Sequence, residues 1–349
     1  MFEKVSFYAS VDDLHVNIQT GFYLLLIAEN TPIPDSFFTE NTRFIGGFFP
    51  SVLFGKEHYN EGIIAAKLSD LTRVYSVCME HLSIIPFPAQ SHSIFTLANS
   101  DSSHMEPFLE TLYSFLPEHA KLIGGAGKNI FSYEKSCHKE ACWGECALVL
   151  ASTQKIGLGV KHGWEPLVSP FIANSCKGRM VEKINFKDAF SVYKDAIEKY
   201  SSLRFHTMDF EEIAQKYPLG IVRYKKDFIV RAPIQTDGSS LSLAGSLDEN
   251  SVIAILQGTK TKLIEAAKEA SQNALNNFEN NAPSSVLLIS CHARFLFLGD
   301  DFNQELETIL SLYPPAMPLW GALSLGELAN DNQEGIAFYN NTCVIGVLP

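Results

Sequence analysis

Runs of hydrophobic residues of strand length recur along the chain, separated by polar stretches that contain glycine or proline. Three segments share one order of elements: an apolar strand, a helix or connection, a glycine-rich strand, a hairpin and a final apolar strand. The segments open with FYLLLIAEN, SIFTLANSDS and SVLLISCHAR, and their glycine-rich strands read RFIGGFFP, KLIGGAGKN and PLWGALSLGE. This order predicts an internal repeat with three copies.

Hydrophobic residues at helical spacing predict helices over 105–116, 186–200, 263–278 and 302–313, and we expect Asn185 to cap the second of these. PLGIVR, FIVRAPIQ, LSLAG and SVIAIL read as four short strands. The predicted fold is therefore α+β (α/β-like). It has two related sheet-containing halves built from repeated strand–helix–glycine-rich strand–hairpin units, with helices packed on the sheets. The segment TMDFEEIAQKY marks the junction and divides the chain into 1–206 and 207–349.

Glycines fall at corresponding places in the three glycine-rich strands: Gly46 and Gly47, Gly124 and Gly125 with Gly127, and Gly321 with Gly326. One interpretation is steric, because glycine allows a neighbouring backbone to approach closely. The other is that backbone amides there face a bound ligand. None of the three strands fits a P-loop or a dinucleotide-binding fingerprint.

Composition and charge exclude several classes of protein. The net charge of -12 repels nucleic-acid backbones, so we expect no nucleic-acid partner. No apolar run approaches the length that spans a bilayer, and the first residues do not read as a signal peptide, so we expect no membrane association. Seven cysteines in 349 residues is an odd count at low density, which favours a reducing compartment. We therefore expect a cytoplasmic protein.

Several ordered motifs together resemble a known family. They are IGLGVKHGWEPLVSP with DAFSVYKDAI, then YPLGIVR, FIVRAPI and LAGSLDENSVIAILQG, and finally SCHARFLFLGDDFNQEL, WGALSLGELA and FYNNTCVIGVLP. In this order they resemble the FIST N-terminal and FIST C-terminal domains, which 1–206 and 207–349 would represent. The resemblance covers roughly residues 20 to 348. His292 stands where the family pattern favours a small residue.

The resemblance implies a small-molecule ligand-sensing protein of bacterial signal transduction, and not an enzyme. It implies an amino acid or a related small metabolite as the ligand, bound in a cleft between the two halves. The output would pass to a separate partner such as a kinase, a chemoreceptor or a cyclic-di-nucleotide enzyme. Two alternatives stay open: a haem-binding nitric-oxide sensor of the same family, and an interaction scaffold without a ligand. For haem, His162 is our first choice of axial ligand.

The candidate ligand-binding residues lie at strand ends or in family motifs: His162, Gly163, Trp164, Asn99, Asp101, Ser290, Cys291, Arg294 and Glu327. Trp164 offers a flat apolar face, and Arg294 could receive a carboxylate with two parallel hydrogen bonds. Arg294 could instead pair with Asp300 or Asp301 at the surface, and Asp101 could simply cap a helix. We expect the strand ends that bear His162, Asp101 and Arg294 to converge on one cleft.

Two other chemistries were weighed. Cys137, His138, Cys142 and Cys146 could bind zinc or an iron–sulfur cluster, but their spacing matches no common pattern. In the alternative, Cys146 starts a buried strand and the others lie on an exposed hairpin. Cys291 next to His292 suggests a nucleophile and its base, but neighbouring strand residues point to opposite faces of a sheet.

Overall fold

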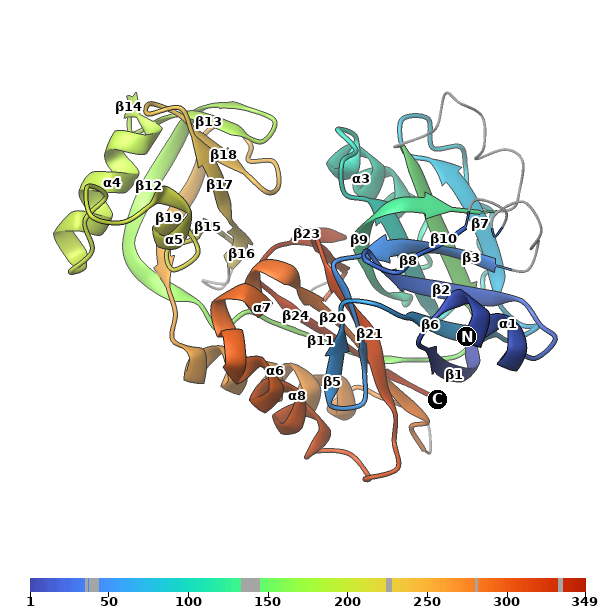
Figure 1. The fold of residues 1–349 in the computed structure, drawn as a ribbon. Helices are drawn as coiled ribbons and strands as arrows, with labels where there is room; N and C mark the ends of the chain where they lie inside the picture. Colours follow the sequence, from blue (N-terminus) through green and yellow to red (C-terminus); the bar gives the residue numbers. More distant parts are fainter. Residues whose placement is uncertain (35–36, 38–43, 133–144, 224–227, 280–281, 332–334) are drawn as a thin grey trace.

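The computed structural model describes the chain except for residues 35–36, 38–43, 133–144, 224–227, 280–281 and 332–334. The described strands form a ten-stranded, a six-stranded and an eight-stranded sheet, with helices packed against them (Figure 1). The predicted α+β fold class is confirmed. No helix in the described part of the chain is long and apolar enough to cross a membrane.

The three segments that match in sequence also match in strand pairing. In each, the opening strand pairs in parallel with the glycine-rich strand and antiparallel with the last strand. In the order opening, glycine-rich and last, these strands are β2 (Tyr23–Ala28), β3 (Phe44–Phe49) and β6 (Ile63–Leu68); β8 (Ser93–Asn99), β9 (Lys121–Phe131) and β10 (Cys146–Ser152); and β20 (Ser285–Cys291), β21 (Leu319–Ser324) and β24 (Cys343–Leu348). A further strand lies antiparallel to each last strand: β1 (Phe2–Tyr8), β7 (Arg73–Cys78) and β11 (Gly157–Lys161).

Each segment also lends backbone to the sheet of another. The hairpin of β4 (Ser51–Phe54) and β5 (Glu57–Tyr59) pairs with β21. The second half of β9 pairs with β3, and the hairpin of β22 (Glu327–Ala329) and β23 (Ala337–Tyr339) pairs with β9. This exchange interlocks the segments, and the ten- and six-stranded sheets enclose one apolar core.

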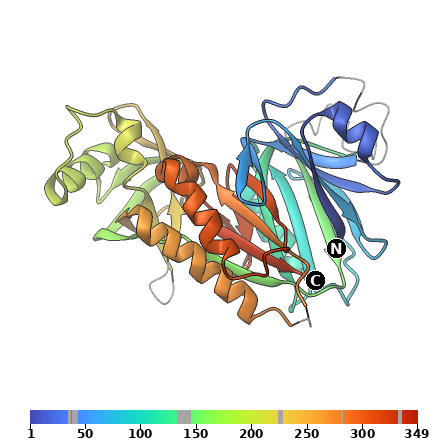
Figure 2. The same cartoon turned by 60° about the horizontal axis from the view of Figure 1, so that its bottom comes forward.

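Helices cover the outer faces of these two sheets: α1 (Val11–Asn17), α3 (Met105–Phe115), α6 (Lys260–Asn276), α7 (His292–Leu298) and α8 (Phe302–Leu310), with a 3₁₀ turn at Gly299–Asp301. Figure 2 shows α6 and α8, in light and dark orange, side by side along the six-stranded sheet. The helices predicted over 105–116, 263–278 and 302–313 are confirmed within a few residues. The chain becomes helical directly after β20, because α7 starts at His292.

The eight-stranded sheet belongs to a unit inserted between β11 and α6, which we call the inserted unit. Its elements are β12 (Glu165–Lys177), β13 (Met180–Ile184), β14 (Lys187–Asp188), α4 (Ala189–Tyr200), α5 (Phe210–Ala214), β15 (Leu219–Val222), β16 (Phe228–Arg231), β17 (Pro233–Thr236), β18 (Leu241–Leu243) and β19 (Ser251–Gln257). The boundary at 206/207 falls between α4 and α5 and stays a prediction. The cap expected at Asn185 is wrong: Asn185 has φ +49 in a turn, and α4 begins four residues later.

One glycine in each glycine-rich strand has the same steric role. A Cβ on Gly46, Gly124 or Gly321 would meet the carbonyl oxygen of the residue paired with it in the parallel opening strand. The oxygens met belong to Leu25 at 2.0 Å, Thr96 at 2.0 Å and Leu288 at 1.8 Å. The steric interpretation is confirmed at these three positions.

Candidate functional site

A cavity of about 240 Å³ lies where the carboxyl ends of β20 and β21 meet the inserted unit. We call it the strand-end cleft. Residues of α5 and β17 in the inserted unit line one side, and residues of α7 in the third segment line the other. The inserted unit contributes Glu211, Ala214, Gln215, Ala232, Pro233, Ile234 and Ala244, and the third segment contributes Cys291, His292, Ala293, Leu296, Ser324, Leu325, Asn340 and Asn341.

Two side chains in this wall hold a buried polar atom without a hydrogen-bond partner. Asn340 is 1% exposed, and its Nδ2 donates to the carbonyl oxygen of Tyr339 at 3.0 Å, but its Oδ1 has no partner among the described residues. The Nδ1 of His292 is also buried and has no hydrogen-bond partner among the described residues. Burial lowers the pKa of His292, so its ring is neutral near pH 7. Because unpaired buried polar atoms are costly, a water or a ligand that pairs with these two atoms would be favoured here.

A buried carboxyl group lies behind this wall. Glu327 accepts hydrogen bonds from Ser324 Oγ at 2.6 Å and from the Thr342 amide at 3.2 Å. Burial raises the pKa of Glu327 to about 8, so the folded protein holds this group largely protonated at neutral pH. Cys291 contacts the same carboxyl group, and burial raises the pKa of its thiol to about 12. The structure therefore brings Cys291 and Glu327 together at the edge of the cleft.

Ser290, the residue before Cys291, is also fully buried. Its Oγ has no hydrogen-bond partner among the described residues. It precedes Cys291 in β20 and therefore points to the other face of the six-stranded sheet. It does not line the strand-end cleft.

Arg294 is fully buried, and its guanidinium group forms hydrogen bonds within the protein. Its Nε and Nη2 donate to the carboxylate of Glu305, its Nη1 donates to the carbonyl oxygen of His162 at 2.7 Å, and its Nη2 also donates to Leu263. The alternative of a surface pair with Asp300 or Asp301 is wrong, because Glu305 is the partner. Four of its five N–H groups are used in these bonds, and Arg294 does not line the strand-end cleft, so it is not placed to receive a ligand carboxylate there.

The His162–Trp164 turn lies beside Arg294 and has a structural environment. Gly163 has φ +80, and a Cβ there would lie 2.7 Å from the carbonyl oxygen of Lys262. Trp164 is 3% exposed, and its Nε1 donates to the Asn341 carbonyl oxygen at 3.3 Å. His162 lines two open clefts of about 420 and 410 Å³.

The ring of His162 does not suit a haem ligand. Its Nδ1 accepts a hydrogen bond from the Trp164 amide at 2.9 Å. An imidazole that ligates iron through Nε2 carries its proton on Nδ1 and donates it to an acceptor. A backbone N–H facing Nδ1 favours the opposite tautomer.

Asn99 and Asp101 lie apart from the other candidates. They follow β8 in the ten-stranded sheet, and Asn99 Oδ1 accepts from the Asp101 amide at 3.1 Å. Asp101 is exposed, and the residue at the N-cap position of α3 is His104. Neither residue lines the strand-end cleft, so of the three strand ends expected to converge, those of His162 and Arg294 meet and that of Asp101 does not.

His292, Asn340 and Asn341 line the cleft but were not among the ligand contacts expected from the sequence. His292 carried a signal, because it departs from the small residue expected after Ser-Cys. Asn340 and Asn341 form a polar pair directly before the last buried strand, and Asn341 has φ +53. The alternation argument for Cys291 and His292 is also wrong, because the strand ends at Cys291 and both residues line the same cleft.

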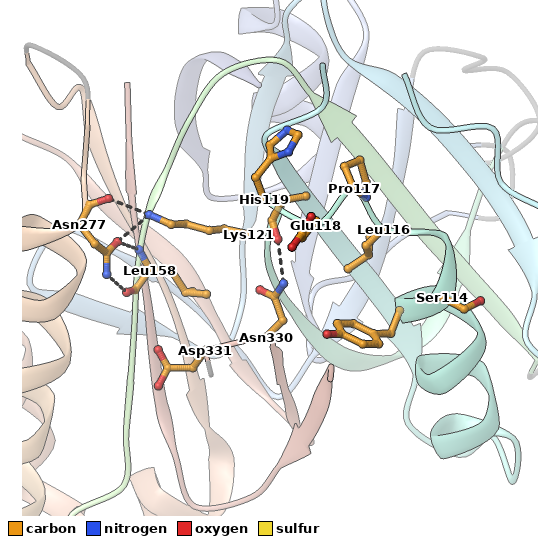
Figure 3. A pocket seen from close by; sticks show the side chains of 12 residues that line it. Ser114, Leu116, Pro117, Glu118, His119, Lys121, Leu158, Asn277, Asn330 and Asp331 are labelled. Carbon is orange, nitrogen blue, oxygen red and sulfur yellow. Dashed lines mark hydrogen bonds between the residues drawn. The ribbon is translucent and has the colours of Figure 1, made fainter. Parts of the chain in front are cut away.

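A larger cleft of about 510 Å³ lies between α3 and the start of β11 (Figure 3). Its polar groups already pair with one another. Lys121 Nζ donates to the carbonyl oxygen of Ile156 and to both oxygens of Asn277, and Asn330 bridges Leu122 and Ala120. These contacts close the ends of α6 and β9, so we interpret this cleft as structural.

Three residues of the candidate metal site, Cys137, His138 and Cys142, lie outside the described residues. Cys146 is buried at the start of β10, as expected. Among the residues that the structure does describe, no group of three or more histidine, cysteine, aspartate or glutamate side chains could hold a metal ion.

The fold and site define an interlocked α+β protein with a small cleft at the strand ends. Two family models match it: the FIST N domain over residues 35–187 and the FIST C domain over residues 189–330. The chain belongs to the FIST family, whose domains are associated with sensory functions in signal transduction. The two matches meet at the start of α4, inside the inserted unit. A search of curated proteins found no match.

Proposed function

We propose that this chain is a small-molecule sensor of bacterial signal transduction and that its ligand occupies the strand-end cleft. One observation carries the proposal: Asn340 Oδ1 and His292 Nδ1 are buried in the wall of a cavity between two units, and neither has a partner in the part of the chain that the structure describes. Pockets that combine apolar walls with a few convergent polar groups are typical ligand sites. The family's association with sensing supports the same function.

The size of the cleft limits the ligand. An apolar cavity of roughly 150 Å³ accommodates benzene. At about 240 Å³, the strand-end cleft accommodates an amino acid or a related small metabolite.

The position of the cleft suggests how binding becomes a signal. The inserted unit is joined to the rest of the chain at two crossings, 162–164 and 258–259. Polar contacts also hold it in place: Arg231 Nη1 donates to the Phe338 carbonyl oxygen at 2.7 Å, and the Ser246 amide donates to Glu106 at 2.9 Å. A ligand that contacts both sides of the cleft binds best when the two sides are close together, so binding favours that arrangement over a more open one.

The output passes, in this proposal, to a separate signalling protein such as a kinase, a chemoreceptor or a cyclic-di-nucleotide enzyme. Binding is a better account of the cleft than catalysis. The Cys291 thiol, with its pKa raised to about 12, is a poor nucleophile at neutral pH. We also infer that the three segments are copies of one unit, which their shared strand pairing supports.

The test is a thermal-shift screen of the purified chain against small metabolites, followed by calorimetry on each compound that binds. Binding raises the melting temperature by mass action. Ala293→Leu fills the strand-end cleft from α7 and should abolish binding. Ser114→Leu places the same side chain in the cleft of Figure 3 and should leave binding unchanged. A ligand that binds Ala293→Leu as well as wild type excludes this site, and a flat screen favours the scaffold alternative.

A further inference from the structure

Among the described residues, the lining of the strand-end cleft contains no lysine or arginine. Its one carboxylate side chain is that of Glu211, on an exposed residue of α5. A carboxylate or phosphate group inside would lose its hydration without gaining a counter-ion, which is strongly unfavourable.

Two arginines lie next to the cleft but do not line it, and each donates hydrogen bonds to buried backbone oxygens. Arg294 directs its donors to Glu305, His162 and Leu263. Arg231 precedes the lining residue Ala232, and its Nε donates to Ser246 while its Nη1 donates to the carbonyl oxygens of Val230 and Phe338. Freeing either guanidinium would leave buried backbone oxygens unpaired.

From this distribution of charge and hydrogen-bonding groups, we propose that the ligand is an uncharged molecule with a small apolar body and one primary amide or hydroxyl group. This inference rests on the proposed sensing function and names the ligand class for the same site. It excludes free amino acids, which are zwitterions at neutral pH.

The two unpartnered atoms determine the polar group of the ligand. Asn340 Oδ1 can only accept, so the ligand must carry an N–H or O–H donor. The neutral ring of His292 presents Nδ1 as a donor or an acceptor, according to its tautomer. A primary amide carries two N–H donors and a carbonyl acceptor, so it can pair with Asn340 and His292 in either tautomer, whereas a hydroxyl group can pair with both only when Nδ1 carries the proton.

The walls determine the rest of the ligand. Eight of the fifteen lining residues are alanine, proline, isoleucine or leucine, and they come from both sides of the cleft. An ammonium group at Asn340 would meet a side chain that is 1% exposed, with no buried carboxylate beside it because Glu327 is held largely protonated. No ion pair would offset the free energy needed to remove water from a cation there.

The experiment uses one aromatic body with different polar groups: benzamide, benzyl alcohol, toluene, benzoate, benzylamine and phenylalanine. Dissociation constants are measured by calorimetry on the full chain near pH 7. We expect benzamide and benzyl alcohol to bind at least tenfold more tightly than the three charged compounds and more tightly than toluene. Charged compounds that bind as well as benzamide overturn the inference.

Two variants test whether Asn340 and His292 cause the preference for an amide or hydroxyl group. Asn340→Leu keeps the side-chain volume and removes the acceptor, so benzamide affinity should fall about tenfold or more while toluene affinity stays or rises. His292→Phe keeps an aromatic ring and removes both nitrogens, with the same expected direction. If either variant fails to fold, the comparison on wild type still decides the inference. Unchanged benzamide affinity in both folded variants overturns it.

The outcomes separate this inference from the proposed function. If only charged compounds bind, and Ala293→Leu abolishes that binding, the ligand class is wrong and the sensing site stands. A metabolite found in the wider screen tests the inference in the same way. If that metabolite is charged, the inferred ligand class is wrong. If neither the aromatic series nor any metabolite binds, both proposals fail.

Discussion

Arg294 and Glu305 form an ion pair with no solvent exposure: Nη2 of Arg294 lies 2.8 Å from Oε2 of Glu305, and both side chains are 0% exposed. The pair joins α7 to α8 across the 3₁₀ turn. The hydrogen bond from Arg294 to the His162 carbonyl oxygen extends this connection to the turn that leads into the inserted unit. One buried side chain therefore fixes α7, and with it one wall of the strand-end cleft.

Arg294→Met should destabilise the protein by about 3–5 kcal/mol, because it leaves the carboxylate of Glu305 buried without its partner. The free energy of unfolding from urea titration measures this. The double variant Arg294→Met with Glu305→Leu should recover most of the loss, since no uncompensated charge remains.

The matched control is an exposed pair in the same region. Lys260 Nζ lies 2.9 Å from Asp301 Oδ2, and both side chains are nearly half exposed. Asp301→Asn should cost less than about 1 kcal/mol, as surface pairs usually do. If Arg294→Met lowers the free energy of unfolding by no more than Asp301→Asn does, the buried pair does not have the structural role that we assign to it.

Arg294 also shows how far sequence reasoning reaches. The position of Arg294 just after a buried strand was predicted correctly, but its observed partner Glu305 is neither the ligand carboxylate nor the surface aspartates that we expected. The sequence could not decide between a ligand and three acidic residues within eleven positions. Only the helical course of residues 292–310 brings Glu305, and neither Asp300 nor Asp301, against it.

Gly124→Ala should destabilise the protein by about 3 kcal/mol or more, because the added Cβ would lie 2.0 Å from the Thr96 carbonyl oxygen in a packed interior. Thermal and urea denaturation measure the loss. Gly238→Ala is the control. Gly238 has φ +94 and open space around it, so the substitution meets backbone strain alone and should cost about 1–2 kcal/mol. Equal costs for the two would contradict the steric role of Gly124.

The glycine pattern could be predicted from the sequence because each of the three segments meets the same local constraint. The exchange of strands between segments was not. Hydrophobic alternation in SVLF and ELA predicts strands but does not say which edge they join, since β4 and β22 pair with strands far away in sequence. The strand-end cleft depends on the same long-range placement, because Cys291 was selected from its strand end but Asn340 faces the cleft only once β20, β22 and β24 are assembled.

Glu106→Ala should loosen the inserted unit. Glu106 Oε1 accepts the hydrogen bond from the Ser246 amide, which links α3 to the inserted unit across 140 residues of sequence. We expect faster hydrogen exchange at the Ser246 amide, with exchange unchanged at the Ile255 amide inside β19, which pairs with β12 and β15. Glu110→Ala, at an exposed position on the same helix, is the control. Unchanged exchange at Ser246 would show that this contact does not restrain the unit.

Glu327 should make stability fall as pH rises. Its pKa lies near 4.5 when exposed in the unfolded chain and at about 8 in the folded protein, because burial disfavours the charged form. Below pH 4.5 both states hold the proton. Between pH 4.5 and about 8 the unfolded chain has released a proton that the folded protein keeps, so this group's contribution to stability declines through that window and is constant above it.

Glu327→Gln tests this sign because it keeps the shape of the side chain and does not titrate. Urea unfolding of both proteins from pH 5 to pH 9 gives a difference in which other titrating groups largely cancel. The stability of wild type relative to the variant should fall with rising pH, by at most about 1.4 kcal/mol per pH unit. Glu211→Gln, at an exposed position on the rim of the cleft, should show no such slope. A difference that stays flat from pH 5 to pH 9 would mean that Glu327 is already ionised in the folded protein, and that a cation can be paired beside the strand-end cleft.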